Sequence, residues 1–178
     1  AKVLAEQGWD GSLRSPGEGD FLAVVDSNVG FNKTNAAVTE TIAYRVEPAN
    51  DGLEATLTLT YTHTAPAGAE TICDRAPRYG DSYDALINRC YWDFVRVYAP
   101  GGSELLEADG LNQPATEQGE HGTTVFTGSF SLRPGDQHVV TLRYRLPADI
   151  PSSPYRLFVR KQAGTLATPL TVTGPRCA

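Results

Sequence analysis

The chain has 178 residues, of which 40% are hydrophobic and 20% are charged, so it is long enough for one domain with a buried core. Its formal net charge of −6 argues against binding nucleic acid or anionic lipid through bulk electrostatics. No run approaches the roughly 18 apolar residues that a membrane-spanning helix needs, so we expect no span within this sequence.

The beginning of the chain predicts a short helical piece and a connector. Ala1–Gln7 suits a helical turn that Gly8 stops, and a stretch rich in Gly, Pro and Ser follows. We expect residues 1–19 to continue from a region upstream of this sequence, and residues 20–176 to form a single domain. The domain would begin with Phe21–Asp26, a short apolar run typical of a buried strand.

Two further strands are predicted after an Asn-rich loop at Ser27–Asn35. The first is Thr39–Glu47, and the turn that follows it ends in Asp-Gly at residues 51–52, which is a strong hairpin signal. The second, Leu53–His63, alternates strictly between the two faces, which is typical of a half-buried antiparallel strand. Its predicted inner face consists of Leu53, Ala55, Leu57, Leu59 and Tyr61.

A long segment without apolar periodicity, Thr64–Arg89, then interrupts the strands, with a helical turn expected at Tyr83–Asn88. A structureless loop of that length is unusual in a compact domain. A disulfide between Cys73 and Cys90 would hold it by closing a loop of about 17 residues, and would stabilise by roughly 3 kcal/mol. We therefore expect this bridge and an oxidising compartment. Cys177 is left over, and its pairing with either of the other two stays open.

The second half of the chain is again rich in strand signals. We expect Ser103–Glu107 to pair back on the strand before it, Asp109–Gly122 to be a polar loop, and Arg133–Asp136 to be the turn of a second hairpin. The predicted strands are Tyr91–Ala99, Thr123–Leu132, Gln137–Leu146, Tyr155–Lys161 and Pro169–Thr173. Seven to nine short strands with almost no helix predict an all-β, immunoglobulin-like sandwich of two antiparallel sheets, with a long disulfide-held loop.

Six stretches carry a resemblance to a known family: GWDG (8–11), GDFLAVVDSNVGFNK (19–33), LEATLTLTYTHTAP (53–66), YWDFVRVYAPGGSEL (91–105), RYRLP (143–147) and VRKQAGT (159–165). In their order and spacing the chain resembles the C-terminal portion of a bacterial cell-surface family catalogued as domain of unknown function 4012. The resemblance implies a transmembrane helix and a larger domain upstream, with this region outside the cell. The family has no established activity, so no catalytic residue is implied.

The Asn-rich loop supplies one carboxylate and three side-chain amides, from Asp26, Asn28, Asn32 and Asn35. Alternating oxygen donors around Gly30 are similar to a calcium loop, but the run of carboxylates and the terminal bidentate Glu are missing. Asn is also what a loop uses to bond its own backbone. We expect a self-bonded loop, with calcium at Asp26, Asn28 and Asn32 as a weaker alternative and recognition of a partner or glycan as a third.

Aromatic residues gather in and beside the disulfide loop, and Tyr79, Tyr83 and Trp92 are the candidates for a binding surface. Aromatic rings with polar tips suit sugars and protein surfaces. They equally suit a loop that packs on its own sheet, which is the interpretation we favour.

No catalytic constellation is visible. The histidines His63, His121 and His138 lack metal-ligand spacing, and no G-x-S-x-G elbow is present. Asp side chains crowd the disulfide loop and the strand after it, where paired carboxylates would suit a glycosidase but a solvated loop is the simpler interpretation. These residues are Asp74, Asp81, Asp84 and Asp93. We expect no enzyme activity, metal or cofactor in this chain.

The leading hypothesis is a non-catalytic extracellular module, used for interaction or spacing in a membrane-anchored protein of the bacterial envelope. Its partner would be a protein or a cell-envelope glycan, with no nucleic acid and with membrane attachment only through an upstream anchor. One alternative is a carbohydrate-binding sandwich that uses the aromatic loop 79–92. Another is an accessory domain of an envelope enzyme whose active site lies upstream.

Overall fold

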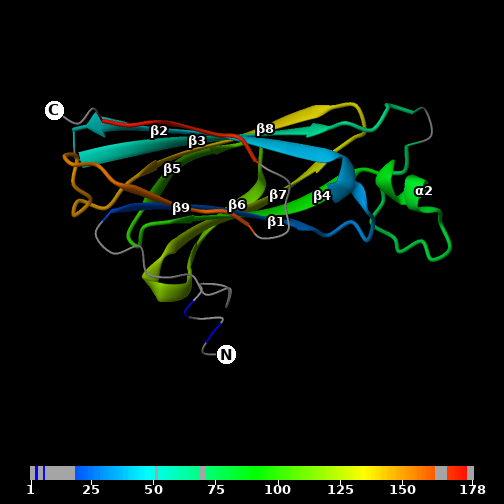
Figure 1. The fold of residues 1–178 in the computed structure, drawn as a ribbon, viewed down its shortest axis with the longest axis horizontal. Coiled ribbons are helices and arrows are strands. Elements are labelled where there is room, and N and C mark those ends of the chain that lie inside the picture. The colour runs from blue at the N-terminus through cyan, green and yellow to red at the C-terminus, as the bar shows by residue number, and fades with distance from the viewer. Residues whose placement is uncertain are drawn as a thin grey trace.

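The computed structural model describes residues 3, 6, 19–50, 52–68, 71–162 and 168–175. In this part of the chain, ten strands form two five-stranded sheets that pack face to face, which confirms the predicted all-β sandwich (Figure 1). The first sheet has the order β6-β7-β4-β1-β9, with β1 (Asp20–Asn28), β4 (Tyr91–Ala99), β6 (Asn112–Gln118), β7 (Thr124–Leu132) and β9 (Leu157–Arg160). The second has the order β10-β2-β3-β8-β5, with β2 (Val38–Ala49), β3 (Gly52–His63), β5 (Glu104–Asp109), β8 (Gln137–Arg145) and β10 (Leu170–Thr173).

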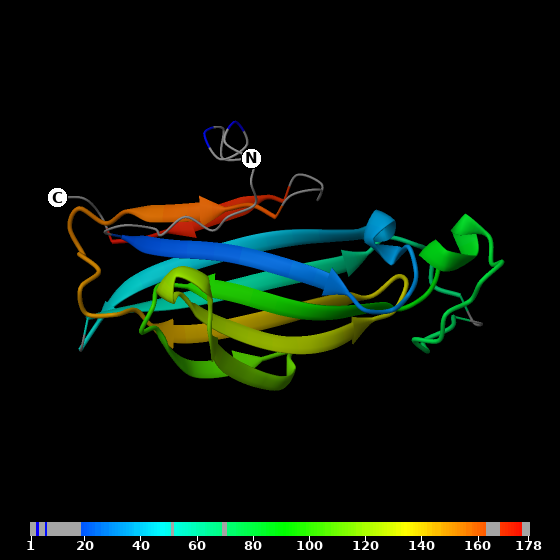
Figure 2. The ribbon, with the colours of Figure 1, turned by 90° about the horizontal axis from the view of Figure 1, so that it is seen from below.

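Three short helical segments join the strands: η1 (Thr34–Ala37), α2 (Tyr83–Ile87) and η2 (Glu120–Gly122). The predicted helical turn is thus present as α2, and it begins because the Ser82 hydroxyl accepts a hydrogen bond of 3.2 Å from the Ala85 N–H. The helix is tied to the loop before η1 by a bond of 3.2 Å from the Lys33 N–H to the Leu86 carbonyl. Helix α2 and the loops around it therefore cover one end of the sandwich (Figures 1 and 2).

The core lies between the sheets because alternate residues of each strand point inward. The predicted hairpin is present: β2 and β3 pair antiparallel, with Ile42 opposite Leu59. The inner face of β3 runs from Leu53 to Tyr61 as predicted, and each of its members is at most 4% exposed. The centre of the core consists of completely buried side chains from β3, β4 and β8, among them Leu57, Leu59, Val95, Val97 and Leu142.

The second predicted hairpin is wrong. Residues 133–136 connect β7 and β8, which belong to different sheets, so this turn crosses from one layer to the other. It is held by the end of β3, since the His63 N–H donates to the Asp136 carbonyl at 3.0 Å and the Gly135 N–H donates back to His63. Two strands with apolar inner faces satisfy the same sequence pattern whether they pair in one sheet or stack across two. The local sequence therefore did not distinguish these arrangements.

The strand after residues 100–103 also pairs with an unexpected partner. We predicted that Ser103–Glu107 would pair back on β4, but β5 pairs antiparallel with β8 in the other sheet. Outward-facing charges of β8 support this pairing, because Arg145 contacts Glu104 at 2.6 Å and Arg143 contacts Glu107 at 3.4 Å. These ion pairs join residues that are distant in sequence, so the local pattern of apolar and polar residues does not predict them.

The polar loop predicted at Asp109–Gly122 contains a strand, β6. All its side chains are exposed, because β6 is an edge strand that pairs only with β7 and covers no core. Pro114 interrupts the ladder where the register shifts between Asn112 and Ala115. A strand without a buried face lacks the apolar alternation by which sequence analysis finds strands.

Both predicted C-terminal strands are present, as β9 and β10, but they pair differently from the rest of the sandwich. Strand β9 runs parallel to β1, and β10 runs parallel to β2. Each sheet thus ends in one parallel pair at its edge, and the two edge strands lie on the same side of the sandwich, one in each layer (Figures 1 and 2). Gln162, two residues after β9, is consequently next to Asp26 of β1, where the candidate site lies.

Some expectations fall outside the described residues. These are most of the N-terminal helical turn and connector, of which Val3 and Glu6 are described and helical, and the pairing of Cys177. The described part of the chain contains no helix long and apolar enough to cross a membrane.

Candidate functional site

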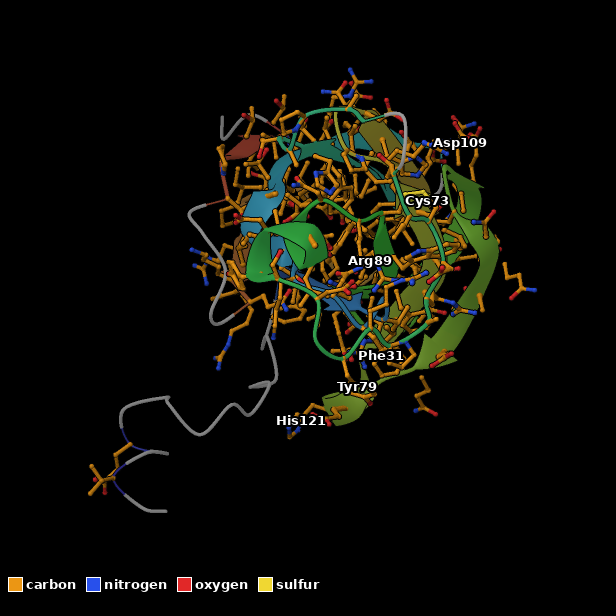
Figure 3. The ribbon with its side chains drawn as sticks, turned by 90° about the vertical axis from the view of Figure 1, so that its right-hand side faces the viewer. Phe31, Cys73, Tyr79, Arg89, Asp109 and His121 are labelled. Atoms are coloured by element: carbon orange, nitrogen blue, oxygen red, sulfur yellow. A yellow bond between two sulfur atoms is a disulfide. The ribbon has the colours of Figure 1, made fainter. Side chains whose placement is uncertain are left out.

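The inner faces of both sheets change from apolar to acidic at the end that α2 covers. On β1 the inward row continues from Val24 to Asp26, and on β4 it continues from Val95 to Asp93, because each step of two residues keeps the same face. On the facing sheet Glu40 of β2 follows Ile42 in the same way. Three carboxyl groups from three strands thus meet between the layers (Figure 3 looks onto this end).

Tyrosine hydroxyls hold two of these carboxyl groups. Tyr61 of β3 donates a hydrogen bond of 2.8 Å to Asp26 Oδ1 across the sandwich, and Tyr91 donates one of 3.0 Å to Asp93 Oδ1. Asp93 is only 1% exposed. Its Oδ2 accepts no hydrogen bond from the described residues, and its carboxyl group contacts that of Asp26. The two groups are therefore close enough that the charge of one opposes ionisation of the other.

Burial raises the pKa of all three carboxyl groups. The pKa of Asp93 rises to about 9, first through burial and then through the nearby charge of Asp26. The pKa of Glu40 rises to about 8 for the same two reasons. Burial also raises the pKa of Asp26, although its hydrogen bonds with Tyr61 and Asp93 oppose the rise. At neutral pH this end of the core thus carries fewer negative charges than its composition indicates.

A cavity of about 900 Å³ opens beside these groups. It brings together segments far apart in sequence, because β1, β2, β3 and β4, the Asn-rich loop and the disulfide loop all contribute to its wall. Its wall includes Asp26, Asn32, Lys33, Asn35, Glu40, Tyr61, Tyr83 and Tyr91. Gln162, two residues after β9, also lines the wall, and its side chain accepts from the Asp26 N–H at 2.8 Å and donates to the Asp26 carbonyl at 3.0 Å.

A buried carboxyl group toward the other end of β1 provides a contrast. Asp20 is completely buried, but both of its oxygens are hydrogen-bonded. Oδ1 accepts from the Phe21 N–H at 2.7 Å, and Oδ2 accepts from Tyr44 at 2.7 Å and from Tyr155 at 2.5 Å. A carboxylate satisfied in this way is a structural group. Glu40 differs, because its buried Oε1 has no hydrogen-bond partner among the described residues.

The Asn-rich loop is self-bonded, as expected. The Asn28 Nδ2 donates to Asn32 Oδ1 at 2.8 Å and to Asn35 Oδ1 at 2.6 Å, and Asn28 Oδ1 accepts from the Gly30 N–H at 2.9 Å. A Cβ at Gly30 would stand 2.5 Å from the Asn32 amide nitrogen, so the network requires glycine there. The Asn28 and Asn32 oxygens suggested for calcium thus accept bonds within the loop. In the described part of the chain no group of three or more His, Cys, Asp or Glu side chains is arranged to hold a metal ion.

The aromatic candidates do not share one surface. Tyr83 lines the cavity and is 59% exposed. Tyr79 is 96% exposed on the disulfide loop and is not part of the cavity wall (Figure 3). Trp92 points to the outer face of β4, where the Arg75 guanidinium lies 5.5 Å from the centre of its ring. Of these three candidates, the structure brings only Tyr83 beside Asp26, Asn32 and Asn35.

The predicted disulfide between Cys73 and Cys90 is present and indicates an oxidising compartment. A buried cation supports the bridge: Arg89 is 1% exposed, and its Nη2 donates to Asp74 Oδ1 at 2.8 Å and to the Ala76 carbonyl at 3.1 Å (Figure 3). The loop is thus fixed at its base by a covalent bond and a charged hydrogen-bond cluster. Sequence analysis missed the role of Arg89, since nothing local marks a buried arginine.

The histidines and the Asp residues of the disulfide loop lie apart. His63 is buried at the base of the loop, with Nε2 3.0 Å from the Arg89 carbonyl, and His138 stacks on Phe130 with ring centres 4.5 Å apart. His121 is exposed in η2. Of the four Asp residues, three are exposed on the loop, namely Asp74, Asp81 and Asp84. Asp93 is instead buried beside Asp26.

Glu40 is the site residue that sequence analysis missed. Its signal was present in the alternation of β2, because it precedes Ile42, Tyr44 and Val46 on the inner face. A charged residue on an apolar face marks a site only once the partners across the sandwich are known.

Comparison with protein-family models, curated proteins and solved structures found no match for the chain.

Proposed function

We propose that the chain is a non-catalytic extracellular interaction module of a membrane-anchored bacterial envelope protein. The observation that carries this proposal is the cavity of about 900 Å³ at one end of the sandwich, with polar and aromatic groups from both sheets and two loops in its wall. Ligand sites are typically concave and contain a few well-placed polar groups. The disulfide and the family resemblance support a place outside the cell.

The contact between Asp26 and Asp93 argues against these two groups as a glycosidase pair. Asp93 is 1% exposed and is not part of the cavity wall. Oδ1 of Asp26 already accepts a hydrogen bond from the Tyr61 hydroxyl. A glycosidase requires two carboxyl groups on either side of a bound sugar, several ångströms apart. Two groups in mutual contact between β1 and β4 leave no room for a sugar between them.

A cell-envelope glycan is the more specific candidate partner. Tyr83 offers a partly exposed ring, and the side chains of Asn32 and Asn35 line the same wall. Rings with neighbouring amides suit a polyhydroxylated ligand. This differs from a platform over residues 79–92, because Tyr79 and Trp92 lie outside the cavity.

Co-sedimentation with isolated bacterial cell-wall sacculi tests the proposal. We expect saturable binding without release of soluble products, at least fivefold weaker for Tyr83→Ala. Tyr79→Ala is the matched control, because that ring is 96% exposed but outside the cavity, and it should bind like the parent chain. Equal binding by both variants would remove the cavity from the proposal. Soluble products that Asp26→Asn abolishes would show that the module is an enzyme.

A further inference from the structure

We propose that the cavity binds an organic ammonium group, held between the carboxyl groups of Glu40 and Asp26 and the rings of the surrounding tyrosines. The inference rests on the proposed function, since it assigns a chemical class to the ligand of the same cavity. A lysine side chain, an amino sugar and a free amine all present this group.

An unpartnered acceptor is the first observation. Glu40 Oε1 is buried and has no hydrogen-bond partner among the described residues, although Glu40 lines the cavity. A buried acceptor without a donor is costly, and an entering N–H group would satisfy it. Asp26 lines the same wall and raises the pKa of Glu40 through its charge, so a positively charged donor is favoured over a neutral one.

Aromatic rings are the second observation. Tyr61, Tyr83 and Tyr91 all contribute to the wall that contains the two carboxyl groups. The face of a tyrosine ring attracts a cation, and the attraction increases where water is excluded. Tyr83 is 59% exposed, so its ring is accessible to a ligand, whereas Tyr61 and Tyr91 are buried.

The described cations that line the two cavities leave this position open. Lys33 lines the large cavity, while Arg160 and Lys161 line a neighbouring cavity of about 210 Å³ that Glu40 also borders. Among the ion pairs of the described residues, none joins these three cations to Glu40 or Asp26. The ammonium group of a ligand would supply the charge that compensates an ionised Glu40.

Proton linkage gives the inference a distinctive signature. The pKa of Glu40 is raised to about 8 by burial and by Asp26, and contacts with Tyr61 and Thr168 only partly oppose the rise. Behind Asp26, the protonated Asp93 and Tyr91 face the same region. At pH 7 Glu40 is therefore mostly protonated, and a bound ammonium group lowers its pKa. Binding should then release a proton and strengthen as the pH rises.

Titration calorimetry with n-butylammonium chloride tests this, with 1-butanol as the uncharged probe. We expect saturable binding of n-butylammonium that is on the order of tenfold tighter at pH 8.5 than at pH 7, because the ionised fraction of Glu40 rises by about that factor. Heats measured in two buffers of different ionisation enthalpy should show proton release at pH 7. Equal binding of 1-butanol, or no saturable binding of either probe, would overturn the inference.

Variants assign the effect to Glu40. Glu40→Gln keeps the shape and removes the charge, so it should weaken n-butylammonium at least tenfold at pH 8.5 and abolish the pH dependence. Glu47→Gln, on the exposed face of the same strand, is the control and should change neither. Circular dichroism of both variants checks folding. Tyr83→Ala, at a half-exposed ring, provides a second test and should also weaken the probe. Equal losses in Glu40→Gln and Glu47→Gln would refute the assignment.

The two proposals fail separately. Binding to sacculi that n-butylammonium does not compete and Glu40→Gln does not weaken would refute the ammonium site and leave the interaction module intact. Binding of n-butylammonium without any binding to sacculi would refute the cell-wall interaction and leave the ammonium site intact.

Discussion

The hydroxyl of Tyr61 on β3 donates a hydrogen bond of 2.8 Å to Asp26 on β1, and so joins the two sheets where the apolar core ends and the cavity begins. The ring of Tyr61 also packs on Phe130, with ring centres 4.7 Å apart. One side chain therefore belongs to both the core and the site. Its two contributions can be separated by removing the hydroxyl alone.

Tyr61→Phe should lower the free energy of unfolding by about 1–3 kcal/mol, because it keeps the ring and leaves Asp26 without its donor across the sandwich. Urea unfolding at pH 7 measures the loss. Tyr83→Phe is the control, at a ring that is 59% exposed, and should stay within about 0.5 kcal/mol. A loss for Tyr61→Phe no larger than that of the control would mean that water replaces the hydroxyl.

Leu59→Ala should cost about 2–5 kcal/mol, since Leu59 is completely buried at the centre of the core. Thr60→Ala, on the outer face of the same strand, should cost less than about 1 kcal/mol. Chemical denaturation of the two variants compares the faces directly. A larger loss at Thr60 would reverse the assigned orientation of β3.

The free energy of unfolding should fall as the pH rises from 7 to 9. The folded-state pKa values of Asp93 and Glu40 are about 9 and about 8, far above their ordinary values, so in this window the folded chain binds more protons than the unfolded chain. Under that condition a rise in pH favours unfolding. The window begins at pH 7 because burial lowers the pKa of His63, whose effect has the opposite sign and is confined to more acidic solution.

Asp93→Asn tests the source of this dependence, because the amide stays neutral at every pH. Urea unfolding at pH 7, 8 and 9 should show a shallower fall for this variant than for the parent chain. Asp84→Asn, at an exposed position of α2, should leave the slope unchanged. A parent stability that is constant or rises over this range would show that both carboxyl groups ionise without cost in the folded chain.

Removal of the disulfide by Cys73→Ser with Cys90→Ser should destabilise the chain by roughly 3 kcal/mol, the loop-closure value for a sequence separation of 17 residues. Peptide mapping of the unreduced protein should first find the two cysteines cross-linked. Limited proteolysis should then cut the double variant faster within residues 73–90 than elsewhere. Unchanged stability would mean that the cluster around Arg89 holds the loop without the bridge.

Much of the fold was predictable from local patterns. The alternation in β3 identified its buried face, the Asp-Gly signal located the hairpin between β2 and β3, and the two cysteines around the long loop identified the disulfide. These features depend on residues that are close in sequence or on a period of two along one strand. The Asn-rich loop was also predictable as self-bonded, because its acceptors and donors lie within a few residues of one another.

The candidate site was predictable only in part. Asp26, Asn32, Asn35 and Tyr83 were singled out from sequence, and the structure places them in one cavity wall. Glu40 was not recognised, and Asp93 was grouped with the Asp residues of the loop rather than with Asp26. The crossing of residues 133–136 between sheets and the parallel edge strands β9 and β10 likewise appeared only in the structure.

The sequence by itself determined which faces of the strands are apolar and where the chain turns, and it predicted the Cys73–Cys90 bridge as one of the possible cysteine pairings. Tertiary structure alone decided which strands share a sheet. It also decided that Asp26, Glu40 and Asp93 meet between the two sheets, at one end of the sandwich. The physical reason is that a strand pattern specifies an orientation but not a neighbour. The pKa of a buried carboxyl group depends on the charges and hydroxyls around it, and here those belong to residues distant in the chain.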